Sequence, residues 1–506
     1  MLLTLIRREI LDNLMTFRFA AAVFITLLLV VAVTAVLIQD YERRLADYNT
    51  SVETHRQELY KRPAYSPGIS RLDIDRPPNP LSIFNVGLDK RLGNEIRVSY
   101  WLVPSLWDAG MNSSDNSFLN IFSSIDIVFI FEVVLSLLAL IFAYDALAGE
   151  YEAGTLRLIL TNPVQRGYIL LAKYLSAMVC LLMPLLMSLL LAMLLLTTSA
   201  SIYLTTDDFL CIGGIIFASV TYLSVFYLIG LLVSAMTGRT STALMLSIFV
   251  WGFLVLVYPN VVLTTTTPQD PSAERGASAL SQIKQIWEEF DRKRKHFLAT
   301  DPVPGEDPMF DINSSNGWGA GDGFSENRLT LSYYYWTVLY YKGELNAESL
   351  PRVPHAQNYY GFLGPQIIDT ADQTWLIRKQ ALDDIFVKPV FVDRTLLKLS
   401  PVGMYDAATQ AWAGTDLKGL QDFFEAVRQY QRTVIAYLHD GDVFKSRSWF
   451  APDKTGVAWD TLPQFSFQRS RIGTNAKRAL PDLFLLLTIN IVLFTIIFLI
   501  FVKSEV

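Results

Sequence analysis

The feature that most constrains this chain is a set of six nearly continuous apolar stretches. Each is long enough to cross a bilayer as a helix, which takes about twenty apolar residues. The whole chain is 52% hydrophobic and only 18% charged, a composition typical of membrane proteins rather than soluble ones. The sequence therefore predicts an all-α polytopic membrane protein. The six predicted spans are residues 19–38, 125–146, 174–197, 209–235, 241–263 and 483–502.

The distribution of basic residues predicts how these spans are oriented. Lysine or arginine residues occur in four short segments, 1–18, 147–173, 236–240 and 503–506, whereas the short segment 198–208 has none. Because short basic loops stay on the cytoplasmic side, both termini are expected in the cytoplasm. The first apolar run lacks a small-x-small cleavage pattern, so it is expected to be a retained span rather than a signal peptide.

Two long segments, 39–124 and 264–482, are then expected on the outer side of the membrane. The first begins with apolar residues at alternating steps of three and four from Ile38 to Leu59, which predicts a helical stalk that continues the first span. A similar pattern follows the fifth span in residues 280–297, and an antiparallel pairing of the two stalks is a hypothesis. We expect a mainly helical extracytoplasmic domain that also has room for some strands.

Several classes of function lack support in the sequence. Both cysteines, Cys180 and Cys211, lie in predicted spans, and the four histidines show no spacing typical of metal ligands. No basic run resembles a nucleic-acid patch, and no nucleophile motif or G-x-x-x-x-G-K-[ST] phosphate loop is present. We therefore predict no catalytic residues, no metal site, no resident cofactor and no nucleic-acid partner.

The most informative segment lies in the predicted cytoplasmic loop after the second span. Gly154 and Thr155 can begin a short helix, Leu156 contributes to its apolar face, and Pro163 ends it. Such a helix suits docking onto a partner, with surrounding charges that orient the contact. An ordinary interfacial helix that joins two spans is the alternative. The charged residues concerned are Glu150, Glu152, Arg157 and Arg166.

This segment resembles the coupling helix of ABC-2-type permeases, which has the form E-x-E-x-G-T-L-R-L-x-L-x-x-P-V-x-R, and the similarity extends to Lys173. Residues 8–19 resemble the amphipathic N-terminal helix of that family, and residues 239–260 its fourth-to-fifth span region. Residues 399–430 are similar to a subgroup with a large extracytoplasmic insertion. That subgroup is related to permeases of multicopper-enzyme maturation and of gliding-type export systems.

The resemblance implies a membrane subunit of an ABC transporter in a bacterial inner membrane. Two permease copies, or two related permeases, would form a dimer, and each coupling helix would bind a separate cytoplasmic ATPase that holds ATP and Mg²⁺. The function then expected is export or extraction of an unknown substrate. The alternative is a mechanotransmitting subunit that drives a periplasmic partner without carrying a solute. A membrane receptor with no ATPase is a third class.

Polar residues inside predicted spans are costly and are therefore functional candidates. Glu132 and Asp126 lie toward the outer end of the second span, and Asn490 lies in the last. Glu132 is expected either to line a polar cavity or dimer seam, or to be a packed residue that is protonated or hydrogen-bonded to a neighbouring helix. Asp145, near the cytoplasmic end, is expected to contact the N-terminal helix or the coupling region.

Overall fold

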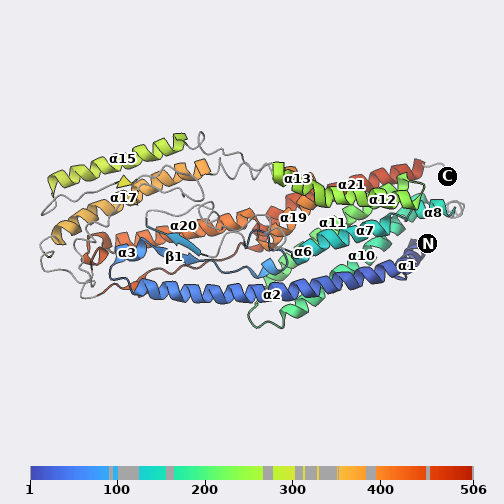
Figure 1. Ribbon diagram of the computed structural model, residues 1–506, viewed down its shortest axis with the longest axis horizontal. Coiled ribbons are helices and arrows are strands. Elements are labelled where there is room, and N and C mark those ends of the chain that lie inside the picture. The colour runs from blue at the N-terminus through green and yellow to red at the C-terminus, as the bar shows by residue number, and fades with distance from the viewer. Residues whose placement is uncertain are drawn as a thin grey trace.

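The computed structural model describes residues 2–90, 95–100, 125–154, 165–265, 277–302, 312–313, 328–329, 350, 353–382, 395–451 and 456–503. These residues form an elongated molecule with a bundle of long helices at one end and a mixed domain at the other (Figure 1). Both chain termini lie at the bundle end, here called the termini end. The mixed domain lies at the far end and is here called the distal domain.

Six helical segments of the described chain are long and apolar enough to cross a membrane, which confirms the prediction of an all-α polytopic membrane protein. Two of them contain a π-helical stretch, η2 (Phe131–Leu135) and η3 (Gly252–Val257). The six segments are α2 (Phe17–Tyr60), α6 (Ile127–Ile130) through η2 and α7 (Ser136–Ala143) to α8 (Ala148–Glu152), α10 (Arg166–Leu196), α11 (Thr206–Met236), α12 (Thr240–Trp251) through η3 to α13 (Tyr258–Thr265), and α21 (Ile472–Lys503).

The helix α11 lies at the centre of the bundle. It packs against α7, α21 and α19 (Pro401–Ala413), and 72% of its most apolar window is buried. The segment from α12 to α13 is at the periphery, with 17% of its window buried. A separate N-terminal helix, α1 (Leu2–Leu14), packs against α10.

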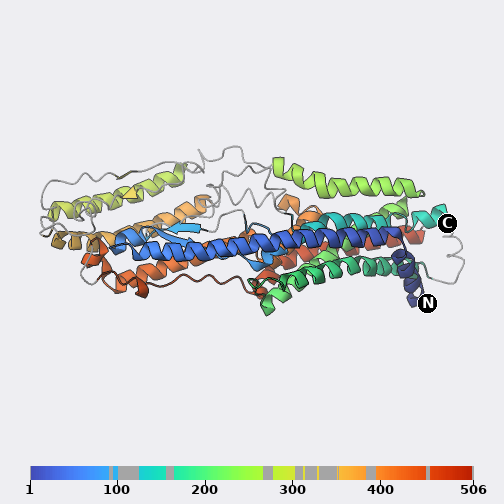
Figure 2. The ribbon, with the colours of Figure 1, turned by 60° about the horizontal axis from the view of Figure 1, so that its bottom comes forward.

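The helix α2 is much longer than a membrane span requires, as the stalk pattern predicts. Its N-cap Thr16 accepts a hydrogen bond from the backbone N–H of Phe19 at 3.3 Å. No glycine or proline occurs in its 44 residues, so nothing in the sequence interrupts the helix before Tyr60. One face of the charged second half stays in contact with protein, beginning at Tyr41, which is 5% exposed. A single straight helix therefore connects the termini end to the distal domain (Figure 2).

The distal domain consists of short strands and three long helices around an aromatic core. In that core, the rings of Tyr360 and Phe450 lie 5.2 Å apart and those of Phe444 and Trp449 4.7 Å apart. Its described elements are α3 (Tyr65–Ile69), the antiparallel pair β1 (Leu72–Asp75) and β2 (Glu95–Val98), α15 (Ala277–Thr300), the antiparallel pair β3 (Ile312–Asn313) and β4 (Arg328–Leu329), α17 (Val353–Leu382), α20 (Leu417–Asp440), η6 (Val443–Lys445), η7 (Arg447–Trp449) and η8 (Trp459–Thr461). The short helix η1 (Pro80–Ile83) lies between β1 and β2 in the sequence, but it packs into the core shared by the spans.

The predicted pairing of the two stalks is wrong, because α15 packs along α17 and not along α2 (Figures 1 and 2). The apolar face of α15 meets aromatic residues of α17, and the ring of Phe297 stacks on that of Phe362 at 4.6 Å. The three-and-four spacing correctly predicts an apolar face on each helix. It carries no information about which helix covers that face.

The helix α19 belongs to the segment expected outside the membrane, yet it packs into the core shared by the spans. Trp412 of α19 lies directly against α11 at Gly214. A Cβ atom at Gly214 would come within 2.3 Å of the Trp412 ring, so only glycine permits this approach. The end of the bundle nearest the distal domain is thus closed by a helix from the distal segment.

Candidate functional site

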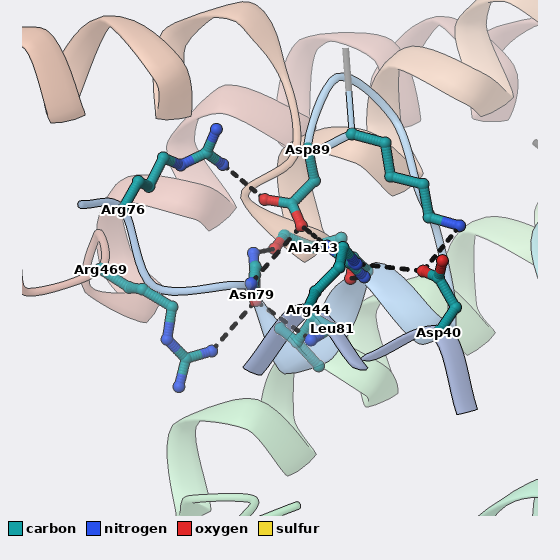
Figure 3. A network of polar contacts seen from close by, with 10 residues as sticks. Asp40, Arg44, Arg76, Asn79, Leu81, Asp89, Ala413 and Arg469 are labelled. Carbon is teal, nitrogen blue, oxygen red and sulfur yellow. Dashed lines mark hydrogen bonds and ion pairs between the residues drawn. The ribbon is translucent and has the colours of Figure 1, made fainter. Parts of the chain in front are cut away.

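A buried network of charged and amide side chains joins the bundle to the distal domain (Figure 3). We call it the junction network. It brings together residues from very different parts of the sequence. Its members are Asp40, Arg44, Arg76, Asn79, Asp89, Lys90, Asp208 and Arg469.

Asp89 is the centre of this network, with a side chain only 2% exposed. Its carboxylate accepts a hydrogen bond from Nη1 of Arg44 at 2.8 Å and another from Nη2 of Arg76. Arg44 also donates to Asp40 at 3.0 Å, and Lys90 lies 2.9 Å from the same Asp40 carboxylate. Two guanidinium groups thus compensate one buried carboxylate, and one of them comes from α2.

A second branch connects the network to the spans. Asn79 donates from its side chain to the backbone carbonyl of Ala413 at 2.8 Å, at the end of α19. Arg469 donates to the Asn79 side-chain oxygen at 3.3 Å and to both carboxylate oxygens of Asp208 at 2.8 and 3.2 Å. Asp208 also forms the capping box of α11 with Thr205. The network therefore fixes α2, α19 and α11 to one another and to the segment before α21.

Asp126 ties the second span to the same region. As the N-cap of α6, it accepts a hydrogen bond from the backbone N–H of Phe129 at 2.8 Å. Its other oxygen accepts from the backbone N–H of Val86 at 2.8 Å. The residue thus starts a helix and holds the loop before Asp89 against it.

Glu132 lies on the π-helical stretch η2, one turn further into the span. Its backbone carbonyl accepts a hydrogen bond from the Tyr222 hydroxyl at 3.0 Å, and the Tyr222 ring stacks on Tyr405 of α19 at 4.3 Å. The half-buried carboxylate has no hydrogen-bond or ion-pair partner among the described residues, and the charges of Asp126 and Asp406 act on it. A group of acidic residues and tyrosines therefore lies where α19 meets the bundle.

The two π-helical stretches are connected. Trp251, which immediately precedes η3, donates from its indole N–H to the hydroxyl of Ser136 at 2.9 Å, directly after η2. Single turns of π-helix carry one extra residue and are frequent at functional sites. The π-helical stretches of the second and fifth spans are thus joined by a side-chain hydrogen bond at their adjacent ends.

Asn490 has a packing role within the bundle. Its side chain donates to the backbone carbonyl of Thr221 at 3.1 Å and accepts from the hydroxyl of Ser224. Ser224 also shares a hydrogen bond of 2.6 Å with Tyr174. These contacts join α21, α11 and α10.

At the termini end, two of the predicted acidic residues, Asp145 and Glu150, form ion pairs within the chain. Asp145 forms an ion pair with Arg18 of α2 at 2.7 Å. Glu150 lies 2.7 Å from the ammonium group of Lys173, which also lies 3.1 Å from Glu9 of α1. The second and third spans and the N-terminal helix are thereby held together around one buried lysine.

Glu152 accepts hydrogen bonds from both the backbone N–H and the hydroxyl of Thr240, at 2.9 and 2.7 Å. It therefore caps the first turn of α12, where a carboxylate is favoured by the helix dipole. Arg166 donates to the last carbonyls of α21, those of Phe501 and Val502. Glu152 and Arg166, which lie on either side of the predicted coupling helix, thus connect the second span to the fifth and the third span to the sixth.

The middle of the predicted coupling helix lies outside the described residues. Gly154 is described, with a φ of +69°, a left-handed conformation that favours glycine and ends α8. The predicted residues outside the description are Thr155, Leu156, Arg157 and Pro163.

A protein-family model described as ABC-2 family transporter protein matches residues 3–315, more than half of the chain. The chain belongs to the ABC-2 transporter family. It is an ABC transporter membrane subunit with several membrane-spanning helices. The match covers the junction residues from α2 to α11, and it ends before α17, α19 and α20.

Two relatives of this ABC-2 family protein carry the same name, "Probable ABC transporter permease protein NosY". The one from Stutzerimonas stutzeri is 32% identical over 130 residues, or 26% of this chain and 47% of the relative. The one from Pseudomonas aeruginosa is 54% identical over 43 residues, or 8% of this chain and 16% of the relative. The chain thus aligns with less than half the length of either relative.

The sequence did not identify the junction network of this ABC-2 protein as a site. Of its members, Asp208 lies in the short loop 198–208, which enters the topology prediction because it has no basic residue. Arg76, Asn79 and Asp89 are separated from Arg469 by almost 400 residues, so no local spacing reveals their association. The one available signal was the polar loop between proline residues, where buried polar groups need partners.

Proposed function

We propose that this chain is a permease subunit that couples ATP hydrolysis by a separate ATPase to movement of the distal domain, which then acts outside the inner membrane. Both termini and the coupling segment would lie in the cytoplasm, where the ATPase binds ATP and Mg²⁺. The observation that supports this proposal most strongly is the continuity of α2. It begins beside the coupling-loop flank at Arg18 and Asp145 and extends without a break past the junction network.

The contacts at the termini end indicate which spans would move first when the ATPase changes conformation. Because Glu150 and Glu152 are bonded to Lys173 and Thr240, a displacement of the coupling segment would move the third and fifth spans together. The side chain left to contact the ATPase in this proposal is Arg157. A basic residue on the docking helix would pair with an acidic group on the partner.

A second copy of the chain, or a related permease, is part of this proposal. The fifth span has large apolar side chains that face away from the bundle, among them Met245 at 78% and Phe249 at 71% exposure. Lipid can cover such a face, but a span this poorly packed within its own chain also provides a surface for a second permease. The dimer would place two distal domains beside each other.

The proposal can be tested by measuring distances in the complex with its ATPase. Both native cysteines are buried, so spin labels attach selectively to cysteines introduced at two exposed positions of the termini end, Phe17→Cys at the start of α2 and Met236→Cys at the end of α11. We expect the distance between these labels to change when ATP and vanadate trap the ATPase. A control pair within the distal domain, Glu53→Cys and His439→Cys, should keep its distance.

An unchanged distance in both pairs during ATP hydrolysis would contradict transmission through α2. The docking step has its own test, in which Arg157→Glu should abolish co-purification of the ATPase. The exposed Arg432→Glu of α20 is the matched control and should leave it intact. Purification of the wild-type chain without any ATPase, with function retained, would instead support a receptor.

Export or extraction of a substrate through the dimer is the second candidate function. It is favoured by the acidic residues around Glu132, whose carboxylate lacks a partner among the described residues. The substitution Glu132→Gln should change transport rate or selectivity if the substrate passes this point, since it removes an ionisable group from the path. A purely mechanical subunit should tolerate it as well as the exposed control Glu288→Gln.

A further inference from the structure

A histidine of α2 faces the polar side of the β1–β2 hairpin. In this antiparallel pair, Asp73 is opposite Arg97 and Asp75 is opposite Glu95. The alternate residues, Ile74 and Ile96 among them, are buried on the other side of the hairpin. The four charged side chains therefore share the face that packs against α2, where His55 lies.

The imidazole of His55 is held in one orientation by a buried carboxylate. Its Nδ1 lies 2.8 Å from Oδ2 of Asp75, whose side chain is 5% exposed. Its other nitrogen, Nε2, lies 3.9 Å from Oε1 of Glu95, beyond hydrogen-bond distance, and has no hydrogen-bond partner among the described residues. A carboxylate on one imidazole nitrogen is the usual support for a histidine that binds a metal through the other.

Two further carboxylates complete the cluster. One potential ligand atom from each of His55, Asp73 and Glu95 lies within 4.8 Å of the others. In a tetrahedral site with metal–ligand distances of about 2.0–2.2 Å, two ligand atoms lie about 3.3–3.6 Å apart. An ion would therefore have to draw the ligand atoms together by a little over 1 Å, and the Glu95 side chain, which is 48% exposed, has room to rotate toward the ion.

We propose that His55, Asp73 and Glu95 form a binding site for a divalent transition-metal ion such as Zn²⁺. One imidazole nitrogen with two carboxylates suits this class of ion, whereas Mg²⁺ and Ca²⁺ prefer oxygen ligands alone. Three protein ligands leave a fourth tetrahedral position open. That position can face the adjacent cavity of about 240 Å³, which His55 and Asp73 border together with Trp459 and Phe465.

The local charge favours a cation at this place. Three carboxylates surround the imidazole of His55: that of Asp75 at 2.8 Å, that of Glu95 at 3.9 Å, and that of Asp73 in the same cluster. Arg97 already supplies one positive charge, since its Nε donates to Oδ1 of Asp73 at 2.8 Å. Arg97 is therefore the natural competitor of a bound ion.

The test is Zn²⁺ titration of the full-length, chelator-treated protein in detergent by isothermal calorimetry. We expect one saturable site per chain that His55→Gln abolishes and that excess Mg²⁺ or Ca²⁺ leaves occupied. The matched control is His439→Gln, an exposed histidine on α20, which should bind Zn²⁺ as the wild type does. Co²⁺ should give the visible absorption of a tetrahedral site in the wild type and not in His55→Gln.

A second variant protects the test against misfolding. Arg97→Gln removes the competing cation and should increase the affinity for Zn²⁺, a gain that a damaged fold does not produce. Asp75→Asn should weaken binding by about 10–100-fold, because the imidazole loses its support. The absence of saturable binding, equal binding by His55→Gln and the wild type, or loss of binding in His439→Gln would each overturn the proposal.

Discussion

The helix α2 is attached at its two ends in different ways. At the termini end, Arg18 and Asp145 form one ion pair whose side chains are 46% and 38% exposed. At the junction, Arg44 and Asp89 are 14% and 2% exposed and belong to a network of further charged partners. Exposed pairs contribute little because water screens them, whereas a buried charge is costly once its partner is lost.

This difference shows which attachment can change during a functional cycle. An exposed pair can break and reform at low cost, so the termini end can follow an attached ATPase. The buried network has no cheap alternative arrangement and should keep α2 fixed to α19 and to the loop before Asp89. The end of α2 at Arg18 would then move with the ATPase, and the helix would transmit this movement to the distal domain.

The largest effect is expected from Asp89→Ala, because it leaves Arg44 and Arg76 without their shared carboxylate. Removal of one partner from a buried pair costs about 3–5 kcal/mol, which should appear in the free energy of unfolding of the detergent-solubilised protein. The control is Asp47→Ala, which breaks an exposed pair with Arg43 on the same helix. Equal effects of the two substitutions on the free energy of unfolding would show that burial does not make the junction attachment stronger than an exposed ion pair.

The substitution Lys173→Gln probes whether all contacts at the termini end are weak. Lys173 is 6% exposed and separates the carboxylates of Glu150 and Glu9, so its loss leaves two acidic groups facing each other. We expect a loss of about 3 kcal/mol in the free energy of unfolding, close to that of Asp89→Ala. Restoration by the added substitution Glu150→Gln would identify charge as the cause. A loss below about 1 kcal/mol would show that this end is weakly held throughout.

The smallest effect on stability is expected from Asp145→Asn, which breaks only the exposed pair with Arg18. The free energy of unfolding should fall by less than about 1 kcal/mol, and by still less at high salt. Coupling should respond more than stability, as a reduced change in the distance between labels at Phe17 and Met236 during ATP hydrolysis. A large loss of stability would mean that this pair is structural and not a movable contact.

Local pattern was sufficient to predict the spans and the continuation of α2. Apolar length identifies a membrane helix, and an uninterrupted spacing up to Leu59 identifies a helix that does not stop at the bilayer. The same reasoning failed for the partner of α15 and gave no sign that α19 enters the bundle core. The partner of α15 and the position of α19 both depend on which apolar faces meet in the folded chain. The spacing of apolar residues does not show which faces these are.

For the candidate sites too, the sequence predicts what is local and does not predict which side chains meet in the folded chain. Glu150, Glu152 and Asp145 could be singled out because one loop carries them, but their intramolecular partners, such as Lys173 and Thr240, depend on how neighbouring spans pack. The proposed metal site has no local sequence signal, because His55 has no second histidine at a spacing typical of metal ligands. Here a single histidine on a helix meets carboxylates from a hairpin, an arrangement made by the tertiary fold.

The uninterrupted length of α2 has a geometric consequence. Its 44 residues, at a rise of about 1.5 Å each, form a rod about 66 Å long. If the helix pivots where the junction network holds Arg44, a tilt of about 5° would carry Tyr60, about 24 Å beyond the pivot, sideways by about 2 Å. A rotation too small to disturb the packing of the spans could therefore open or close a gap of atomic size at the tip of the distal domain.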